Sequence, residues 1–409
     1  MTNSSDLGMF LLIAMVSMAI SMVIIPLMMR YADRLGMVDK PDPRKVHAMP
    51  IPRVGGVGIV IGALVPMVIW LPSTPPVYSF VFGCVVLLIF GVWDDMKELG
   101  HYVKFVGQFI AVIAVVYFGD LYVAHFPYMG LEALPESIGK PFTVLALVGV
   151  INALNHSDGL DGLAGGESLL SFGAVAYLAF LYGGTSVVII ACAMIGGIFG
   201  FLRFNSHPAR VFMGDGGSQV VGFSLGIVVV LLTQEVNPVL SSALPLLLIG
   251  LPIIDILAVF FLRAKAKRNL FRATKNHIHH RLLELGLYHY ESVMAIYSIQ
   301  AFFVICAILF PYESDLLITT LYLLVSALVF ILLTIAERRG YRLHRTSRTD
   351  QRSMTLPGLF SDKRLVALPM QVLQTGLSIF LIGAALTAAE VPMDIAVSAI
   401  ILVVILSVL

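Results

Sequence analysis

Carboxylate and carboxamide side chains are concentrated in three short stretches of this chain. They read DDMKEL from Asp94, NALNHSDGLDGL from Asn152 and PARVFMGDGGS from Pro208. Neighbouring carboxylates repel one another and favour a bound cation, and oxygen ligands of this kind suit Mg²⁺. The stretches therefore predict a magnesium-assisted reaction. A solvated helix end after Asp94 and a flexible loop before Ser218 are the alternative interpretations.

The third stretch carries a further signal, because Gly-Asp-Gly-Gly-Ser directly precedes a predicted helix. The first turn of a helix presents backbone N–H groups and a partial positive charge to an anion. Asp215 would offer a metal ligand beside that anion. This pattern predicts phosphate chemistry, although a lone glycine-rich turn is weak evidence by itself.

Two basic stretches could supply cations to the same chemistry. One contains Lys45 and His47 within a proline-rich segment, and the other reads His277-Ile278-His279-His280-Arg281 after a run of basic residues. Three histidines could bind zinc, but hard Asp and Asn groups dominate the other stretches, so phosphate contact is favoured. A stiff connector and a basic membrane-facing loop remain alternative interpretations.

These stretches must be positioned by membrane helices. Of the 409 residues, 58% are hydrophobic and only 12% are charged, compared with about a quarter charged in soluble chains. The 26 basic and 25 acidic residues nearly balance, which argues against a nucleic-acid partner. Thirteen segments are apolar enough to predict spans, at 8–29, 54–71, 77–93, 103–118, 141–154, 163–182, 185–202, 217–234, 239–262, 292–310, 315–336, 365–389 and 394–409.

The distribution of basic residues predicts the orientation of these spans. With the N-terminus outside, Lys140 is the single one of the 26 basic residues that falls on the outer side, as the positive-inside rule requires. All the motif stretches then lie on the inner side. We predict an all-α polytopic bundle of about 11 core helices in residues 1–336, a basic segment at 337–364 and a two-helix hairpin of unknown role at 365–409.

The motif stretches resemble those of the polyprenyl-phosphate N-acetylhexosamine-1-phosphate transferases. DDMKEL matches DDxxEL, NALNHSDGLDGL matches NxxNxxDGxDGL, and PARVFMGDGGS matches PAxxFMGDxGS. HIHHRL and DKPDPRKVHAMPIPRVGG match the histidine and first-loop patterns, so the resemblance spans residues 39–281. The HIHH form is closest to the bacterial type that transfers N-acetylglucosamine (GlcNAc) 1-phosphate to undecaprenyl phosphate, and less similar to the lipid I synthase.

This resemblance implies a reaction, partners and a location. A UDP-N-acetylhexosamine, most simply UDP-GlcNAc, would give its sugar 1-phosphate to undecaprenyl phosphate with release of UMP. Mg²⁺ would be the cofactor, with Mn²⁺ as an alternative. The product would begin a cell-envelope polysaccharide such as O-antigen (lipopolysaccharide biosynthesis), common antigen or the teichoic acid linkage of the cell wall. The enzyme would be a multi-pass protein of the bacterial inner membrane with its active site facing the cytoplasm.

The resemblance also implies roles for individual residues. Asp215 and Asn155 are expected to bind the metal, and Phe212 is expected to stack on uracil. The expected catalytic residues are Asp94, Asp95, Asp158, Asp161, Asp215, His279 and His280. The expected substrate-binding residues are Lys45, His47, Asn152, Asn155, Phe212, His277 and Arg281. Direct attack by the lipid phosphate is favoured over a two-step route through an aspartyl phosphate.

Two other functions remain as alternatives. One is the lipid I synthase reaction, and the other is transport of a nucleotide sugar or a lipid-linked sugar. A transporter should show polar groups near mid-span and matching halves, whereas the polar stretches here lie at the inner ends of the spans. The sequence leaves open which sugar is used, which glycan follows, and whether the protein forms a homodimer.

Overall fold

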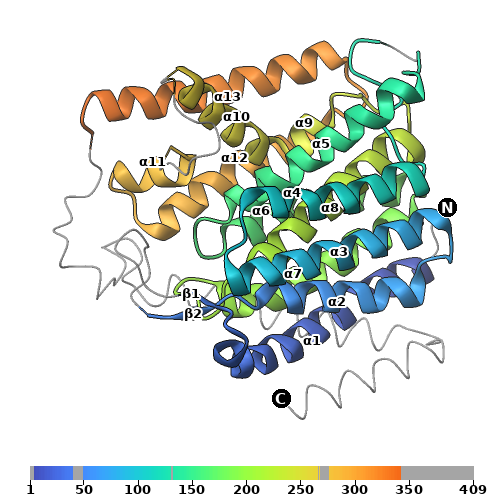
Figure 1. Cartoon of the computed structure of the whole chain (residues 1–409). Coiled ribbons are helices and arrows are strands. Elements are labelled where there is room, and N and C mark those ends of the chain that lie inside the picture. Colours follow the sequence, from blue (N-terminus) through green and yellow to red (C-terminus); the bar gives the residue numbers. More distant parts are fainter. Residues whose placement is uncertain (1–3, 40–48, 130–131, 266, 268–275, 342–409) are drawn as a thin grey trace. The chain divides into compact units, whose positions relative to one another are not determined.

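The structure, a computed structural model, describes residues 4–39, 49–129, 132–265, 267 and 276–341. Within these residues it is almost entirely helical (Figure 1). The helices are α1 (Ser4–Leu35), α2 (Gly55–Trp70), α3 (Pro75–Lys97), α4 (His101–Ile113), α5 (Glu136–Ser157), α6 (Leu163–Leu181), α7 (Thr185–Asn205), α8 (Asp215–Leu231), α9 (Pro245–Leu248), α10 (Gly250–Lys265), α11 (Ile278–Glu284), α12 (His289–Leu309) and α13 (Asp315–Arg338). Two π-helical turns, Ala114–Phe118 and Leu232–Val236, extend α4 and α8.

Eight of the described helices are long and apolar enough to cross a membrane: α1, α3, α5, α6, α7, α8 with its π-helical extension, α12 and α13. Two shorter apolar helices cover Gly55–Trp70 and Tyr102–Phe118. The predicted class, a mostly helical polytopic membrane protein, is confirmed. The exact number of spans and their orientation stay predictions. Residues 342–364 of the predicted basic segment 337–364, and the whole predicted hairpin 365–409, lie outside the described residues.

The ninth predicted span, 239–262, is not one continuous helix. The chain forms turns after Asn237, makes the short helix α9, breaks at Ile249 and begins α10 at Gly250. Backbone groups freed by such a break need polar partners inside a membrane protein. Gln300 supplies them, because its side chain accepts from Leu251 N at 3.2 Å and donates to Leu248 O at 3.1 Å. Periodicity of apolar residues cannot reveal a break that a distant glutamine stabilises.

Helix α8 is the most buried of the spans, with 94% of its apolar window inside the bundle. Glycines allow α2 and α3 to approach its first turn closely. A Cβ on Gly56 would lie 2.2 Å from Gly217 N, and a Cβ on Gly91 would lie 2.3 Å from Gly216 Cα. No side chain fits at such distances. The two contacts bring the start of α2 and the last part of α3 against the start of α8.

A short hairpin closes the same end of the bundle. Strands β1 (Val38–Asp39) and β2 (Ile51–Pro52) pair antiparallel, and Figure 1 shows them at the end where α11 also lies, away from the start of α1. Phe212 joins this hairpin to the segment before α8, since its N–H donates to Pro52 O and its carbonyl accepts from Gly55 N. The inner-side stretches thus meet at one end of the bundle.

Candidate active site

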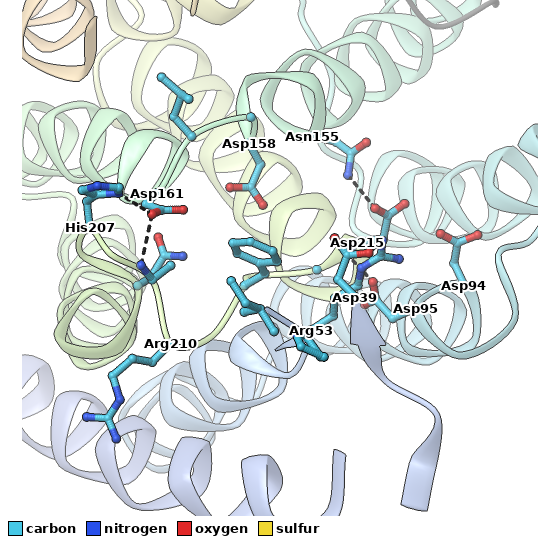
Figure 2. Close-up of a pocket in the computed structure, with 18 of the residues that line it drawn as sticks. Asp39, Arg53, Asp94, Asp95, Asn155, Asp158, Asp161, His207, Arg210 and Asp215 are labelled. Carbon is cyan, nitrogen blue, oxygen red and sulfur yellow. Dashed lines mark hydrogen bonds and ion pairs between the residues drawn. The ribbon is translucent and has the colours of Figure 1, made fainter. Parts of the chain in front are cut away.

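A polar pocket of about 900 Å³ opens at this end of the bundle. Its lining comes from the predicted stretches and includes Asp94, Asp95, Asn155, Asp158, Asp161, Phe212, Asp215 and His280. Figure 2 shows Asp94 and Asp215 at one end, Asp161 and His207 at the other, and Asp158 between them. The structure therefore brings together carboxylates that are more than a hundred residues apart in the sequence.

Lys104 organises the first end of the pocket, which we name the Lys104 end. Its Nζ lies 2.7 Å from Asp94 Oδ2 and 2.6 Å from Asp215 Oδ2. One ammonium group thus offsets the repulsion between two carboxylates. The sequence pattern predicts Lys104 only as one of the basic residues on the inner side and predicts no site role for it. Its position just inside an apolar segment, after the DDMKEL stretch, was the available signal.

Asp95 has a different position from its neighbour Asp94. Its carboxylate accepts hydrogen bonds from Asp215 N at 3.0 Å and from Gly216 N at 3.2 Å. These are the first backbone N–H groups of α8, which the sequence predicted would receive a phosphate. Asp95 already occupies them, so that expectation is corrected: the start of α8 is capped by a side chain of α3 and holds Asp215 in place.

Asn155 completes the Lys104 end, and Asp158 lies between the two ends of the pocket (Figure 2). Asn155 Nδ2 donates to Asp215 Oδ1 at 3.2 Å and to Ser218 Oγ at 2.7 Å, which turns the carboxamide toward the predicted metal ligand. Asp158 accepts no hydrogen bond from the described residues. Burial, followed by the negative charges of Asp215 and Asp161, raises the pKa of the Asp158 carboxyl to about 7. This group is open to a ligand.

The chemistry of these donors fits a hard divalent cation. Carboxylate oxygens of Asp94 and Asp215 lie at one end of the pocket beside the carboxamide of Asn155, and Asp158 lies next along the pocket (Figure 2). Oxygen ligands of this kind suit Mg²⁺. Lys104 shows that positive charge is stabilised between two of them. The raised pKa of Asp158 also indicates a place that favours a cation, because a positive charge beside this carboxyl would lower its pKa again.

Asp161 forms the other end of the pocket, the Asp161 end. Its Oδ2 lies 2.7 Å from His207 Nδ1 and accepts from Ala209 N at 3.0 Å, while Asp161 N donates to His289 Nε2 at 3.1 Å. The carboxylate therefore clamps the turn before α6 to the loop after α7. The predicted catalytic role of Asp161 stays a prediction, but its hydrogen bonds are those of a structural group.

The side chains of Asp161, His207 and His289 each offer one possible metal-ligand atom, and these atoms lie within 4.8 Å of one another. The rings of His207 and His289, however, are stacked, with centroids 4.0 Å apart and planes inclined by 18°. Nitrogen lone pairs lie in the ring plane, so two nearly parallel rings cannot both point at one ion. In this arrangement the cluster is a clamp for Asp161.

The histidine stretch divides between the pocket and the protein interior. His280 lines the pocket, whereas His277 is buried and pairs through Nδ1 with Asp255 Oδ2 at 2.7 Å. His279 lies against the backbone of Gly159, where an added Cβ would be 2.3 Å from its Nε2. Burial, followed by the positive charges of His280 and His277, lowers the pKa of His279 to about 3, so this ring stays neutral.

Other residues predicted to bind substrate have partners inside the protein. Arg281 is buried and binds both carboxylate oxygens of Glu337, at 2.6 and 2.9 Å, and Thr334 Oγ1 at 3.0 Å, which anchors α11 to α13. Asn152 Nδ2 donates to Gln108 Oε1 at 2.7 Å, in a buried carboxamide network below the pocket. Phe212 lines the pocket, and its stacking on uracil stays a prediction. Lys45 and His47 lie outside the described residues.

A second cavity, the apolar groove, has a volume of about 940 Å³ and runs between α4, α5, α8 and α10. Apolar side chains such as Leu145, Val229 and Phe260 dominate its lining. Two of its lining residues, Lys104 and Asn155, also line the polar pocket. The charged pocket and the apolar groove therefore meet at the Lys104 end.

Comparison with known proteins gives consistent matches. The family model "Glycosyl transferase family 4" matches residues 77–233, which include Asp94, Asn155 and Asp215. The chain is 33% identical over 329 residues to a "probable undecaprenyl-phosphate N-acetylglucosaminyl 1-phosphate transferase" of Bacillus subtilis, covering 80% of this chain and 90% of that protein.

Two further relatives have similar names. An "undecaprenyl-phosphate alpha-N-acetylglucosaminyl 1-phosphate transferase" of Escherichia coli K12 is 29% identical over 332 residues, covering 80% of this chain and 90% of that protein. A "decaprenyl-phosphate N-acetylglucosaminephosphotransferase" of Mycobacterium tuberculosis is 33% identical over 305 residues, covering 65% of this chain and 74% of that protein.

Proposed function

The chain belongs to glycosyl transferase family 4, among its polyprenyl-phosphate GlcNAc-1-phosphate transferases, and from this premise we propose that UDP-GlcNAc and undecaprenyl phosphate are its substrates. An oxygen of the lipid phosphate attacks the β-phosphorus of UDP-GlcNAc. The bond from that phosphorus to the bridging oxygen breaks, and UMP leaves with the electron pair. The products are UMP and undecaprenyl diphosphate GlcNAc.

The observation that carries this proposal is the meeting of the apolar groove with the polar pocket at Lys104 and Asn155. A lipid phosphate has a long apolar chain and a charged head group, and it needs both surroundings at once. The groove suits the chain, while the carboxylates, Lys104 and a cation suit the reacting phosphates. A soluble donor can reach the same point through the open pocket.

Charge is the main physical obstacle, because two polyanions must approach one another. We assign Asp215 and Asn155 as the residues that would hold Mg²⁺. When bound there, Mg²⁺ offsets phosphate charge and stabilises the UMP that leaves. Lys104 is in reach of the acceptor phosphate at the end of the groove, so its ammonium group can leave Asp94 and pair with that phosphate.

Asp94 then aligns the acceptor rather than acting chiefly as a base. A phosphate monoester has a second pKa of about 6 and is mostly dianionic at neutral pH, so removing a proton from it contributes little. Asp95, held by the backbone of α8, fixes the position of Asp215. Asp158 remains to contact the donor or the cation. We favour a single direct displacement with these groups in place.

The same proposal assigns a location and a pathway position. We propose that the pocket faces the cytoplasm at the bacterial inner membrane, where UDP-sugars are available; the positive-inside pattern of the sequence supports this orientation. Residues 1–336 form the catalytic unit. The product is the first lipid-linked intermediate of a cell-envelope polysaccharide, because the reaction consumes a lipid carrier that has no sugar attached.

Purified protein in lipid nanodiscs gives the direct test. We expect UMP release and a GlcNAc-labelled diphosphate lipid only when undecaprenyl phosphate, radiolabelled UDP-GlcNAc and Mg²⁺ are all present. UDP-GalNAc and UDP-MurNAc-pentapeptide serve as competing donors, and mass spectrometry of the lipid identifies the sugar. A product carrying MurNAc-pentapeptide would indicate the lipid I synthase reaction, and uptake of UDP-GlcNAc into proteoliposomes without UMP release would indicate a transporter. Exchange of labelled UMP into UDP-GlcNAc without any lipid acceptor would contradict direct displacement.

A further inference from the structure

Asp255 is a buried acid within α10 that the reaction above does not use. Both of its carboxylate oxygens are engaged by the segment that enters α11. Oδ2 lies 2.7 Å from His277 Nδ1, and Oδ1 accepts from Ile278 N at 2.8 Å. A charge inside a membrane protein is costly unless specific partners compensate it. Here the partners are one imidazole and the first backbone N–H of α11.

This carboxylate determines which nitrogen of His277 carries a proton. A carboxylate can only accept hydrogen bonds, so His277 Nδ1 must be the protonated nitrogen. The ring plane is fixed at the same time, because the second oxygen is held by Ile278 N. One side chain of α10 thus fixes both the tautomer of His277 and the start of α11.

Contacts of the fixed His277 ring extend to residues that form the pocket. His277 stacks on His279, with centroids 5.7 Å apart and planes inclined by 8°. His279 in turn lies against Gly159, directly after Asp158, where no Cβ would fit. His280, the next residue, lines the pocket. A continuous set of contacts therefore runs from Asp255 to the turn that carries Asp158.

We propose that Asp255 is a positioning residue, which acts through His277 to hold the histidine stretch against the Asp158 turn in the geometry that the transfer reaction requires. This inference rests on the proposed function. Asp255 does not touch substrate, since it is absent from the lining of the polar pocket. A carboxylate that orients a histidine in this way, as seen behind metal-bound histidines, typically contributes a factor of about ten to a hundred.

The Asp255→Asn variant separates this role from simple folding. Its amide oxygen can still accept from Ile278 N, so the α11 cap is kept, but its NH₂ group faces His277 Nδ1 and requires the other tautomer. We expect turnover with UDP-GlcNAc to fall by about ten- to a hundredfold, with little change in the thermal unfolding midpoint. Unchanged turnover would overturn the proposal.

A matched control is Glu167→Gln, which also converts a buried carboxyl to a carboxamide. Glu167 accepts a short hydrogen bond from Ser157 Oγ, and a glutamine oxygen can accept the same bond. We expect this variant to keep turnover within about threefold, the range of a small hydrogen-bond change. Glu167 lines the same small cavity as Asp255 and His279, so an equal loss of activity would show that this buried cluster as a whole is required, and the specific role of the Asp255–His277 pair would be wrong.

A double-mutant cycle with His277→Ala tests whether Asp255 acts through that ring. If it does, adding Asp255→Asn to His277→Ala has almost no further effect, because the shared path is already broken. Fully additive losses would contradict the proposal. Nitrogen-15 NMR of labelled histidines supplies a readout independent of turnover: the resonance missing in His277→Ala should report an Nδ1-protonated ring in the wild type and an Nε2-protonated ring in Asp255→Asn.

The proposed function and this inference can fail separately. If wild-type protein makes no GlcNAc lipid, the proposed function fails, and the tautomer measurement still tests the link between Asp255 and His277. If the wild type is active while the NMR signal of His277 is the same in both proteins, the positioning role is wrong.

Discussion

At the Lys104 end of the polar pocket two carboxylates share one ammonium group, whereas at the Asp161 end a single carboxylate is held by an imidazole and a backbone N–H. The sequence predicted catalytic aspartates at both ends: Asp94, Asp95 and Asp215 at the first, and Asp161 at the second. The difference lies in what a ligand can displace. A lysine side chain can move to a phosphate, but a backbone N–H cannot leave its acceptor without rearranging the loop.

The hydrogen-bond donors around an aspartate, more than its residue type, therefore decide whether it can take part in the reaction or serves to hold the structure. Asp94 and Asp95 are adjacent in sequence, yet Asp94 pairs with Lys104 and Asp95 caps α8. We therefore expect variants at the Lys104 end to reduce chemistry strongly, and variants at the Asp161 end to weaken donor binding modestly.

Asp215→Asn should have the largest effect, a loss on the order of a thousandfold in turnover. The change removes the carboxylate charge that attracts both Lys104 and the proposed Mg²⁺. Initial rates of UMP release at saturating substrates measure it, with the exposed Asp33→Asn as the surface control. A variant that kept more than about a tenth of wild-type turnover would contradict the proposed metal site.

Lys104→Gln should reduce turnover by about a hundredfold and raise the KM for undecaprenyl phosphate, because a desolvated charge pair with phosphate is lost. The KM for UDP-GlcNAc should change much less. Lys97→Gln is the matched control, since Lys97 is exposed at the end of α3 and outside the pocket lining. Equal, small effects of the two substitutions would remove Lys104 from the mechanism.

The pKa of Asp158, raised to about 7, predicts a pH dependence. If the ionised carboxylate contacts donor or cation, kcat/KM should rise about tenfold between pH 6 and pH 8, as one group titrates through 7. Folding stability should change in the opposite direction: the contribution of the protonated carboxyl is complete below its ordinary pKa and is lost as pH rises through 7. Asp158→Asn should flatten both profiles, and a wild-type pH step that survives this substitution would assign the titration to another group.

Asp161→Asn should have the smallest effect, about a three- to tenfold increase in the KM for UDP-GlcNAc with little change in kcat. The carboxamide oxygen can still accept from Ala209 N, so most of the clamp remains. Substrate titrations at saturating acceptor lipid measure it. A loss as large as that of Asp215→Asn would show that both ends of the pocket take part in the reaction, and that the Asp161 end is not only structural.

Motif spacing predicted several of the residues that gather in the polar pocket. Asp94, Asn155, Asp158 and Asp215 line one pocket, as their placement on the inner ends of apolar spans implied. The same reasoning could not find Lys104, whose role depends on two carboxylates from other helices. It also predicted that Arg281 binds substrate, whereas Arg281 pairs with Glu337 of α13 and is not among the residues that line the pocket.

The sequence by itself determined the membrane class and the set of polar stretches, because hydropathy and local motifs are properties of neighbouring residues. Tertiary structure alone decided the broken helix at Ile249, the capping of α8 by Asp95 and the pairing of Asp255 with His277. Each of these depends on hydrogen bonds between groups distant in the chain. Such bonds exist only after packing has removed water and left each polar group to its nearest protein partner.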